Sequence, residues 1–195
     1  MLLDFWFDFS SPYAYLASTQ IDSIAARNGA TVRWRPMLLG AIFKDVGTAN
    51  VPFLAASPER QRWLANDIDR WAKHWSVPFR FTPHFPLRTV LALRTWMIHP
   101  EAHEYGQRLF AAAWADGEDL ADPEVLLRHG ATPELLLRAP SQRDALTQST
   151  GEARARGVFG APSCVVHRDG REWLFWGQDR LDLVEATLQG WTPPV

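Results

Sequence analysis

The sequence predicts an α/β fold in which one sheet is interrupted by a large helical insertion. Three observations lead to this prediction. The first 36 residues read as strand, helix and strand, an order that implies two parallel strands joined by a right-handed crossover. Residues 38–156 then show the spacing of helices, and residues 163–176 return to strand-like runs.

The opening unit is predicted from alternating residues followed by a helix start. Ser10-Ser11-Pro12 follows the alternating run, and proline in the first helical position after a serine cap starts a helix. This helix ends at Asn28-Gly29, and a second strand over residues 31–35 is stopped by Pro36. The apolar residues that alternate in the first strand are Leu3, Phe5, Phe7 and Phe9.

The middle of the chain is predicted to be helical. Its clearest signal is one apolar stripe at the spacing i, i+4, i+7 and i+11, which we expect to pack in the core. The stripe consists of Leu64, Ile68, Trp71 and Trp75. Further helices are expected near residues 88–98, 101–115, 124–129, 133–138 and 141–156. The expected N-caps are Asp122, Thr132 and Ser141, with Pro123 and Pro133 in first turns.

The end of the chain predicts a hairpin and a last helix. Residues 163–167 and 172–176 are two strand-like runs that flank Asp169-Gly170, a dipeptide typical of tight hairpin turns. Apolar residues at helical spacing from Leu181 to Leu188 mark the last helix, with Asp179 as its expected cap.

The order of these elements is β-α-β, a helical block, and then β-β-α. This order fits a thioredoxin-like fold with a large helical insertion. We therefore expect a discontinuous thioredoxin-like domain (residues 1–37 and 157–195) around a helical insertion domain (residues 38–156).

Composition and charge exclude several classes of function. The chain has 195 residues, a formal net charge of −2 and one Cys. This charge offers no basic surface for nucleic acid or an anionic membrane, and one Cys allows no internal disulfide and no C-x-x-C redox pair. Cys164 lies in a predicted core strand, where we expect a buried, inert thiol. Without a signal-peptide pattern or a membrane-spanning segment, we expect a soluble, cytoplasmic protein.

Metal binding is not expected. His99 and His103 are four residues apart, but Pro100 follows the first and no third ligand is evident. The helical motif of the metalloproteases is absent.

Three segments carry residues suited to binding a small anion or zwitterion. Ser11 opens a helix after a predicted parallel strand, where N–H groups stabilise an anion; alternatively, Ser11 only caps the helix. Pro162 precedes the third strand, either as a plain turn or as a cis proline that exposes the backbone of Ala161. Gln178-Asp179-Arg180 offers either a helix cap with an exposed Arg or groups that bind an amino acid-like zwitterion.

Lys44 and Asn50 are weaker candidates. The chain uses 18 Arg and only 2 Lys, so Lys44 can reflect a need for a compact point charge. The alternative is a solvated surface lysine. Asn50 lies in a loop before Pro52 and offers a side-chain donor.

Four segments taken together resemble one family. They are residues 4–16 (DFWFDFSSPYAYL), 35–36 with 39–44 (RP, LGAIFK), 157–162 (GVFGAP) and 175–181 (FWGQDRL). The chain resembles the 2-hydroxychromene-2-carboxylate isomerases, which are allied to kappa-class glutathione transferases and to the wider DsbA-like group. The resemblance covers nearly the whole chain in order, and it implies glutathione as cofactor and a homodimer.

The resemblance also implies roles for single residues. Ser11 would hold the glutathione sulfur and favour its thiolate, and Ala161, before cis Pro162, would pair with the glutathione backbone. Lys44 would face the carboxylate of an aromatic keto acid substrate, with Asn50 beside it. The residues expected around the γ-glutamyl end are Trp176, Gly177, Gln178, Asp179 and Arg180. Relatives can carry Tyr near the position of Phe85. Phe85 has no hydroxyl, so only its aromatic ring is expected to contribute to substrate binding.

The implied reaction is cis–trans isomerisation of an unsaturated keto acid by reversible addition of a thiolate. A kappa-like transferase, which would instead join the thiol permanently to an electrophile, is the alternative enzyme. A glutathione-binding protein without catalysis is the alternative outside the enzymes. A disulfide oxidoreductase is rejected, because Ser11-Pro12-Tyr13-Ala14 stands where the C-x-x-C pair would be.

Overall fold

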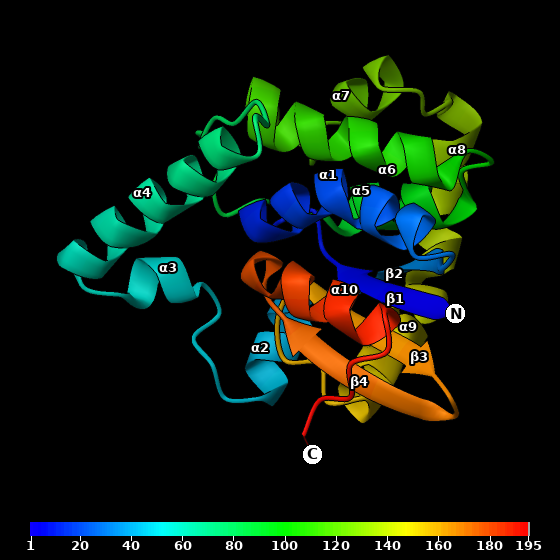
Figure 1. Ribbon diagram of the computed structural model, residues 1–195. Coiled ribbons are helices and arrows are strands. Elements are labelled where there is room, and N and C mark those ends of the chain that lie inside the picture. Colours follow the sequence, from blue (N-terminus) through cyan, green and yellow to red (C-terminus); the bar gives the residue numbers. More distant parts are fainter. Residues whose placement is uncertain (195) are drawn as a thin grey trace.

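The computed structural model describes residues 1–194, and its centre is one four-stranded sheet (Figure 1). The strand order is β2-β1-β3-β4. Strand β1 (Leu2–Phe7) is parallel to β2 (Thr31–Pro36) and antiparallel to β3 (Ser163–Arg168), which pairs antiparallel with β4 (Arg171–Trp176). The predicted α/β class and the thioredoxin-like order of elements are therefore confirmed.

The opening β-α-β unit follows the local sequence signals. Helix α1 (Pro12–Arg27) begins with Pro12 after the N-cap Ser11, as predicted. Strand β2 runs through Pro36, one residue further than predicted. The reason is its position at the edge of the sheet, where a residue without an N–H is tolerated.

The insertion contains more helices than the sequence predicts. Two short ones, α2 (Leu39–Asp45) and α3 (Pro52–Ala55), lie where no separate helix was expected. The long α4 (Pro58–His74) carries the predicted apolar stripe, of which Ile68 is buried and Trp71 and Trp75 pack against the core. The remaining segments are α5 (Val90–Ile98), α6 (Ala102–Ala111), a π-helical turn (Ala112–Asp116), α7 (Pro123–Arg128), α8 (Pro133–Arg138), a 3-10 turn (Ala139–Gln142) and α9 (Arg143–Ala155).

Two of the three N-caps expected in the insertion are confirmed. Asp122 accepts from the Glu124 N–H, and Thr132 accepts from the Leu135 N–H. The prediction for Ser141 is wrong, because a 3-10 turn precedes α9 and the Ser141 hydroxyl donates backwards to the Arg138 carbonyl.

The C-terminal unit confirms the hairpin and corrects the start of the last helix. Asp169 and Gly170 have φ values of 52° and 73°, the left-handed pair that a two-residue hairpin turn requires. Helix α10 (Leu181–Leu188) follows a 3-10 turn (Gln178–Arg180), and Arg180 occupies its N-cap position. Asp179 lies inside that turn and pairs with Arg180, so it does not cap the helix as predicted.

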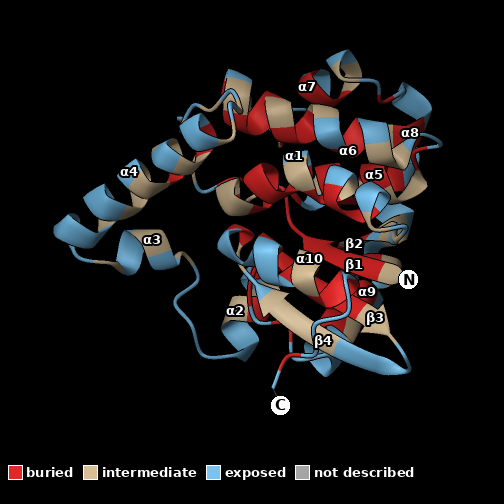
Figure 2. Cartoon of the chain, in the orientation of Figure 1, coloured by how far each residue is buried: buried red, intermediate tan, exposed pale blue. Residues whose placement is uncertain are grey.

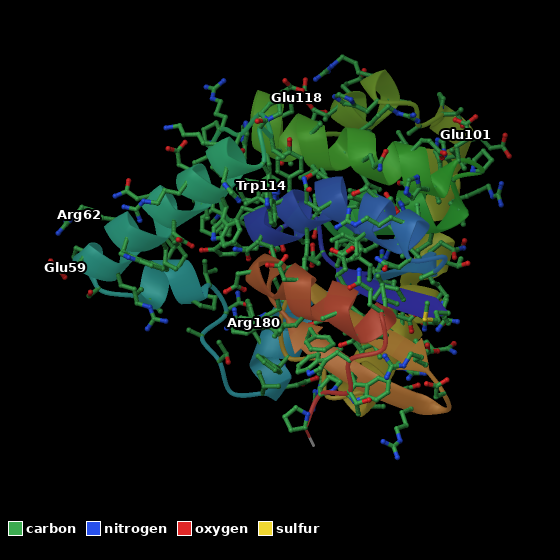
Figure 3. The ribbon with its side chains drawn as sticks, in the orientation of Figure 1. Glu59, Arg62, Glu101, Trp114, Glu118 and Arg180 are labelled. Atoms are coloured by element: carbon green, nitrogen blue, oxygen red, sulfur yellow. The ribbon has the colours of Figure 1, made fainter. Side chains whose placement is uncertain are left out.

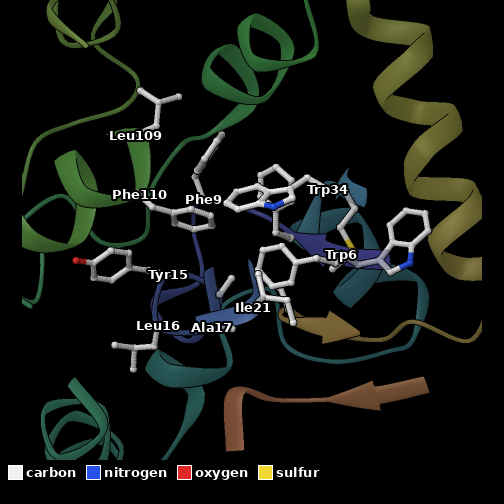
Figure 4. Close-up of a cluster of buried hydrophobic side chains, with 14 of the residues drawn as sticks. Trp6, Phe9, Tyr15, Leu16, Ala17, Ile21, Trp34, Leu109 and Phe110 are labelled. Atoms are coloured by element: carbon white, nitrogen blue, oxygen red, sulfur yellow. The ribbon is translucent and has the colours of Figure 1, made fainter. Parts of the chain in front are cut away.

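Helices enclose the sheet on both faces. Helices α1 and α10 contact each other and pack on one face, and α9 packs against β2 from the other. Strand β1 is buried throughout its length except at Leu2 (Figure 2). In Figure 4, Phe9 and Phe110 meet edge to face beside Tyr15 of α1, while Trp6 points away from them.

One hydrophobic cluster joins the sheet to α5, α6 and α9 of the insertion. Helix α4 adds Ile68 and Ala72 to this cluster, but α3 and most of α4 project from the body with much of their surface exposed (Figures 1 and 2). The division into units of 1–37 with 157–195 and 38–156 stays a prediction about independent domains.

Candidate functional site

Ser11 joins two parts of the chain that are far apart in sequence. It lies just beyond the end of β1 and its side chain is nearly inaccessible, at 5% relative exposure. Its hydroxyl oxygen accepts from the Ala14 N–H at 3.1 Å, which caps α1, and its hydroxyl hydrogen is donated to the Ala161 carbonyl at 2.9 Å. Ser11 is therefore a cap and also a donor aimed at the loop before β3.

That loop contains the cis proline that the sequence analysis raised as one alternative. The Ala161–Pro162 peptide bond is cis. The Pro162 carbonyl accepts from the Gly177 N–H at 3.0 Å, and the Ser163 hydroxyl donates to the Gly160 carbonyl at 2.8 Å. Within residues 1–194 the N–H of Ala161 donates to no other group. The loop thus holds a free backbone donor beside Ser11.

The Gly177 turn completes this part of the site. Gly177 has φ = 102°, and a Cβ there would lie 2.5 Å from a carboxylate oxygen of Asp179. Trp176 is half exposed and packs on Phe159, with ring centroids 5.0 Å apart. Its indole nitrogen lies so close to Gly160 that no Cβ would fit there. The structure therefore brings Ser11, Ala161, Pro162, Trp176 and Gly177 together.

Two carboxylates, those of Asp67 and Asp179, lie near Tyr13 in the first turn of α1. Burial, together with the charges of Asp67 and Asp179, raises the pKa of the Tyr13 phenol to about 12. Burial and the Asp179 charge raise the pKa of Asp67 as well, against the opposing effect of Arg70. Figure 3 shows Arg180 at the start of α10, on the side from which α3 and α4 project. A cationic group of a ligand is favoured beside these carboxylates.

Asp67 was not predicted from the sequence. It lies on α4, whose periodicity was interpreted only for its apolar stripe. Its neighbour Ile68 belongs to the apolar stripe and is buried. A carboxylate directly beside that stripe was the one sign in the sequence that could have indicated Asp67.

The residues predicted for the substrate side lie on adjoining segments. Phe85 packs against Phe81, Phe53 and Trp114, with ring centroids 5.2, 5.6 and 6.4 Å apart respectively. Trp114, labelled in Figure 3, donates its indole N–H to the Phe9 carbonyl at 2.8 Å, so this aromatic cluster reaches the end of β1.

Lys44 and Asn50 are both exposed. Lys44 lies on α2 and forms no ion pair with any described residue. The Asn50 side-chain oxygen lies 3.3 Å from the position of a Cβ at Gly40. No hydrogen bond or ion pair in residues 1–194 connects either residue to Ser11.

Asp8, which the sequence analysis did not single out, accepts hydrogen bonds from three separate segments. Burial raises the pKa of its carboxyl, opposed by hydrogen bonds from Thr89, Leu39 and Ser10. A carboxylate between Phe7 and Phe9, at the end of a strand expected in the core, was the signal available in the sequence.

The single thiol of the chain is buried in the core. Cys164 is buried in β3, and burial raises its pKa to about 12. The predicted burial of this thiol is confirmed, and its lack of reactivity stays a prediction.

The two histidines considered as metal ligands have other partners. His99 Nε2 lies 3.0 Å from the Gly130 carbonyl, and His103 Nε2 lies 2.9 Å from an Asp22 carboxylate oxygen. In the described part of the chain, three or more His, Cys, Asp or Glu side chains nowhere gather as they would around a metal ion. No helix among those residues has the length and apolar character needed to cross a membrane.

A serine at the start of α1, opposite a cis proline loop, defines a thioredoxin-like protein of the DsbA type that lacks the redox cysteines. The chain belongs to the DsbA-like thioredoxin domain family, whose match spans residues 2–189. It is 28% identical to a 2-hydroxychromene-2-carboxylate isomerase from Sphingobium xenophagum, over 95% of this chain and 97% of that one. It is 30% identical to glutathione S-transferase kappa 1 from Caenorhabditis elegans, over 96% of this chain and 90% of that one.

A solved structure of a 2-hydroxychromene-2-carboxylate isomerase has the same fold. It superimposes with a TM-score of 0.78 at 24% identity, covering 97% of this chain and 95% of the other. The resemblance inferred from the sequence segments is confirmed. These relatives are isomerases and glutathione transferases, which supports an enzyme of this family.

Proposed function

We propose that this protein is a glutathione-dependent cis–trans isomerase that acts on 2-hydroxychromene-2-carboxylate and yields trans-o-hydroxybenzylidenepyruvate, a step in aromatic catabolism. One observation carries the proposal. The group at the start of α1 that faces the cis proline loop is the hydroxyl of Ser11, and the only thiol of the chain, Cys164, is buried with a raised pKa. A reaction that needs a thiolate must therefore obtain it from a bound cofactor.

The residues present fit a γ-glutamyl peptide thiol such as glutathione. The free N–H of Ala161, in a loop with a cis bond to Pro162, suits pairing with a peptide backbone. The carboxylates of Asp67 and Asp179 favour an ammonium group, and Arg180 favours a carboxylate. Gln178, which is buried, and the wall formed by Trp176 and Gly177 complete this end of the site.

Ser11 and α1 stabilise negative charge at the reacting sulfur. When bound, glutathione supplies the thiolate for a reversible addition to the conjugated bond of the substrate. The Ser11 hydroxyl turns from the Ala161 carbonyl and donates to the sulfur, and the N-terminus of the 16-residue α1 adds its positive dipole end. Lowering a thiol pKa from about 8.5 to about 6.5 gains only about threefold in rate, because nucleophilicity falls as well. Positioning and stabilisation of the developing enolate must therefore supply most of the rate.

The substrate side provides one cation and an apolar wall. Lys44 binds the substrate carboxylate, and Asn50 offers a donor next to it. Phe85, held by Phe53 and Trp114, packs against the planar ring. In our proposal the protein is a cytoplasmic homodimer that binds no nucleic acid.

A kappa-class-like glutathione transferase is the second candidate, because a kappa-class relative is as similar to the chain as the isomerases are. The two reactions differ in the fate of glutathione. An isomerase regenerates it at every turnover, whereas a transferase consumes one equivalent for each product.

An absorbance assay with 2-hydroxychromene-2-carboxylate, with and without glutathione, tests the proposal. We expect turnover only with glutathione, whose concentration stays constant throughout. Turnover that persists after thorough removal of glutathione would contradict the proposed mechanism. Stoichiometric loss of glutathione would identify a transferase.

A further inference from the structure

The Asp8 carboxylate is buried beneath the candidate site and accepts three hydrogen bonds. Asp8 is 3% exposed. Its Oδ1 accepts from the Ser10 N–H at 3.0 Å and from the Thr89 hydroxyl at 2.6 Å, and its Oδ2 accepts from the Leu39 N–H at 2.9 Å. No Lys, Arg or His of residues 1–194 pairs with it, so hydrogen bonds alone compensate its burial.

Each of the three donors lies close in sequence to a proposed site residue. Ser10 directly precedes Ser11. Leu39 is the first residue of α2, which carries Lys44. Thr89 is the N-cap of α5 and follows Phe85 by four residues. One carboxylate therefore touches the thiol-binding segment and both substrate-binding segments.

Local sequence does not fix these segment starts by itself. The N-cap of α2 is Leu38, which has no side chain that can accept a hydrogen bond. Thr89 makes no side-chain cap for α5, and its hydroxyl donates to Asp8. Asp8 thus supplies an acceptor for the first N–H of α2, one of the first-turn N–H groups that have no partner within the helix.

We propose that Asp8 is a positioning residue that sets the distance between Ser11 and the segments carrying Lys44 and Phe85. This inference rests on the proposed function for the reaction that it affects. A carboxylate that only filled the core would be a poor choice, since its burial opposes folding while an apolar side chain would favour it. Hydrogen bonds from three segments to one carboxylate do hold those segments in one relative position. A shift of about 1 Å in the position of a reacting group can lower a rate about 100-fold.

Thr89→Val tests the proposal against a matched control, Thr95→Val. Both threonines are buried, but the Thr95 hydroxyl donates within α5 to the Leu91 carbonyl. Thr89→Val removes one of the three donors and keeps the volume, so we expect kcat to fall about tenfold while the dissociation constant for glutathione changes less than about twofold. Thr95→Val is expected to keep the kcat of the wild type, and Thr89→Ser, which keeps the donor, restores most of the loss. Asp8→Asn is expected to lower kcat by about 100-fold.

Amide hydrogen exchange gives a readout that does not depend on activity. Thr89→Val is expected to speed exchange at the Ser10 and Leu39 amides, both bound to Asp8, whereas Thr95→Val leaves both unchanged. If the wild-type protein shows no glutathione-dependent turnover, the proposed function fails and exchange alone decides the positioning role. If Asp8→Asn does not fold, Thr89→Val decides. Equal kcat and equal exchange in Thr89→Val and Thr95→Val would overturn the inference.

Discussion

The Ser11 hydroxyl donates to the Ala161 carbonyl across 2.9 Å, between residues 150 positions apart in the chain. The same oxygen accepts from the Ala14 N–H, so its orientation is fixed from both sides. Ser11 therefore holds the cis proline loop against the start of α1. In the proposed reaction, the cofactor sulfur replaces the Ala161 carbonyl as the acceptor of the hydrogen bond that the Ser11 hydroxyl donates.

Ser11→Ala is expected to lower turnover about 100-fold at saturating glutathione, because one preorganised donor to the developing charge is lost. The variant also loses an N-cap, which costs about 1 kcal/mol of stability. Chemical unfolding separates the two effects, and Ser11→Thr, which keeps the hydroxyl, serves as the control. A rate equal to that of the wild type would remove Ser11 from the proposed mechanism.

Lys44→Gln is expected to raise KM for the substrate about tenfold, because a charge-assisted hydrogen bond to the substrate carboxylate is lost. Glutathione binding, measured by calorimetry, stays unchanged. Lys73→Gln is the matched control, since Lys73 is the only other lysine and pairs with Asp69 on exposed α4. Equal KM values for the two variants would show that Lys44 is an ordinary surface lysine.

Cys164→Ala is expected to keep full glutathione-dependent turnover, since the proposed thiolate comes from the cofactor. In the wild type, burial and the raised pKa of Cys164 predict that a thiol reagent labels it only on unfolding. Labelling rates with and without denaturant, followed by mass spectrometry, check this. Loss of activity in a folded Cys164→Ala variant would mean that the chain's own thiol takes part.

Asp4 provides a test of stability against pH. Burial opposes its ionisation, but hydrogen bonds and charges of Arg33 and His167 outweigh this effect and hold its pKa below the usual value of 3.8. Because the pKa is lower in the folded state, Asp4 stabilises the protein above about pH 4, and this contribution is lost as the pH falls through the folded-state value.

Asp4→Asn is therefore expected to be less stable than the wild type at pH 7, with a difference that shrinks as the pH falls below about 4. Urea unfolding at several pH values measures this. Asp69→Asn, in an exposed pair on α4, serves as the control, because exposed ion pairs contribute little to stability. A constant difference between wild type and Asp4→Asn at all pH values would contradict the assignment.

Sequence signals that act over a few residues were sufficient where neighbours along the chain make the structure. Ser11-Pro12 started α1, and Asp169-Gly170 formed the hairpin turn. Cap predictions failed at Ser141 and Asp179, where the expected cap lies within a 3-10 turn that precedes the helix. Such turns depend on how the helix packs, which a cap residue does not encode.

The parts of the candidate site that the sequence could not predict are contacts between distant segments. Asp8 and Thr89 are 81 residues apart, and Asp67 approaches Asp179 from another helix. No periodicity or spacing connects such pairs. They become visible only when the sheet brings the end of β1 next to α2 and α5.

Gly177→Ala tests whether the turn before α10 shapes the cofactor site. Gly177 has φ = 102°, and an added Cβ would meet the Asp179 carboxylate at 2.5 Å. Gly190→Ala is a matched control, because Gly190 has φ = 112° and nothing lies within 4 Å of its Cβ position. Both variants are expected to lose about 1 kcal/mol from the positive φ. Only Gly177→Ala must also displace Asp179, so glutathione affinity measured by calorimetry is expected to fall about tenfold in that variant alone. Equal affinities in the two variants would mean that Asp179 does not bind the cofactor.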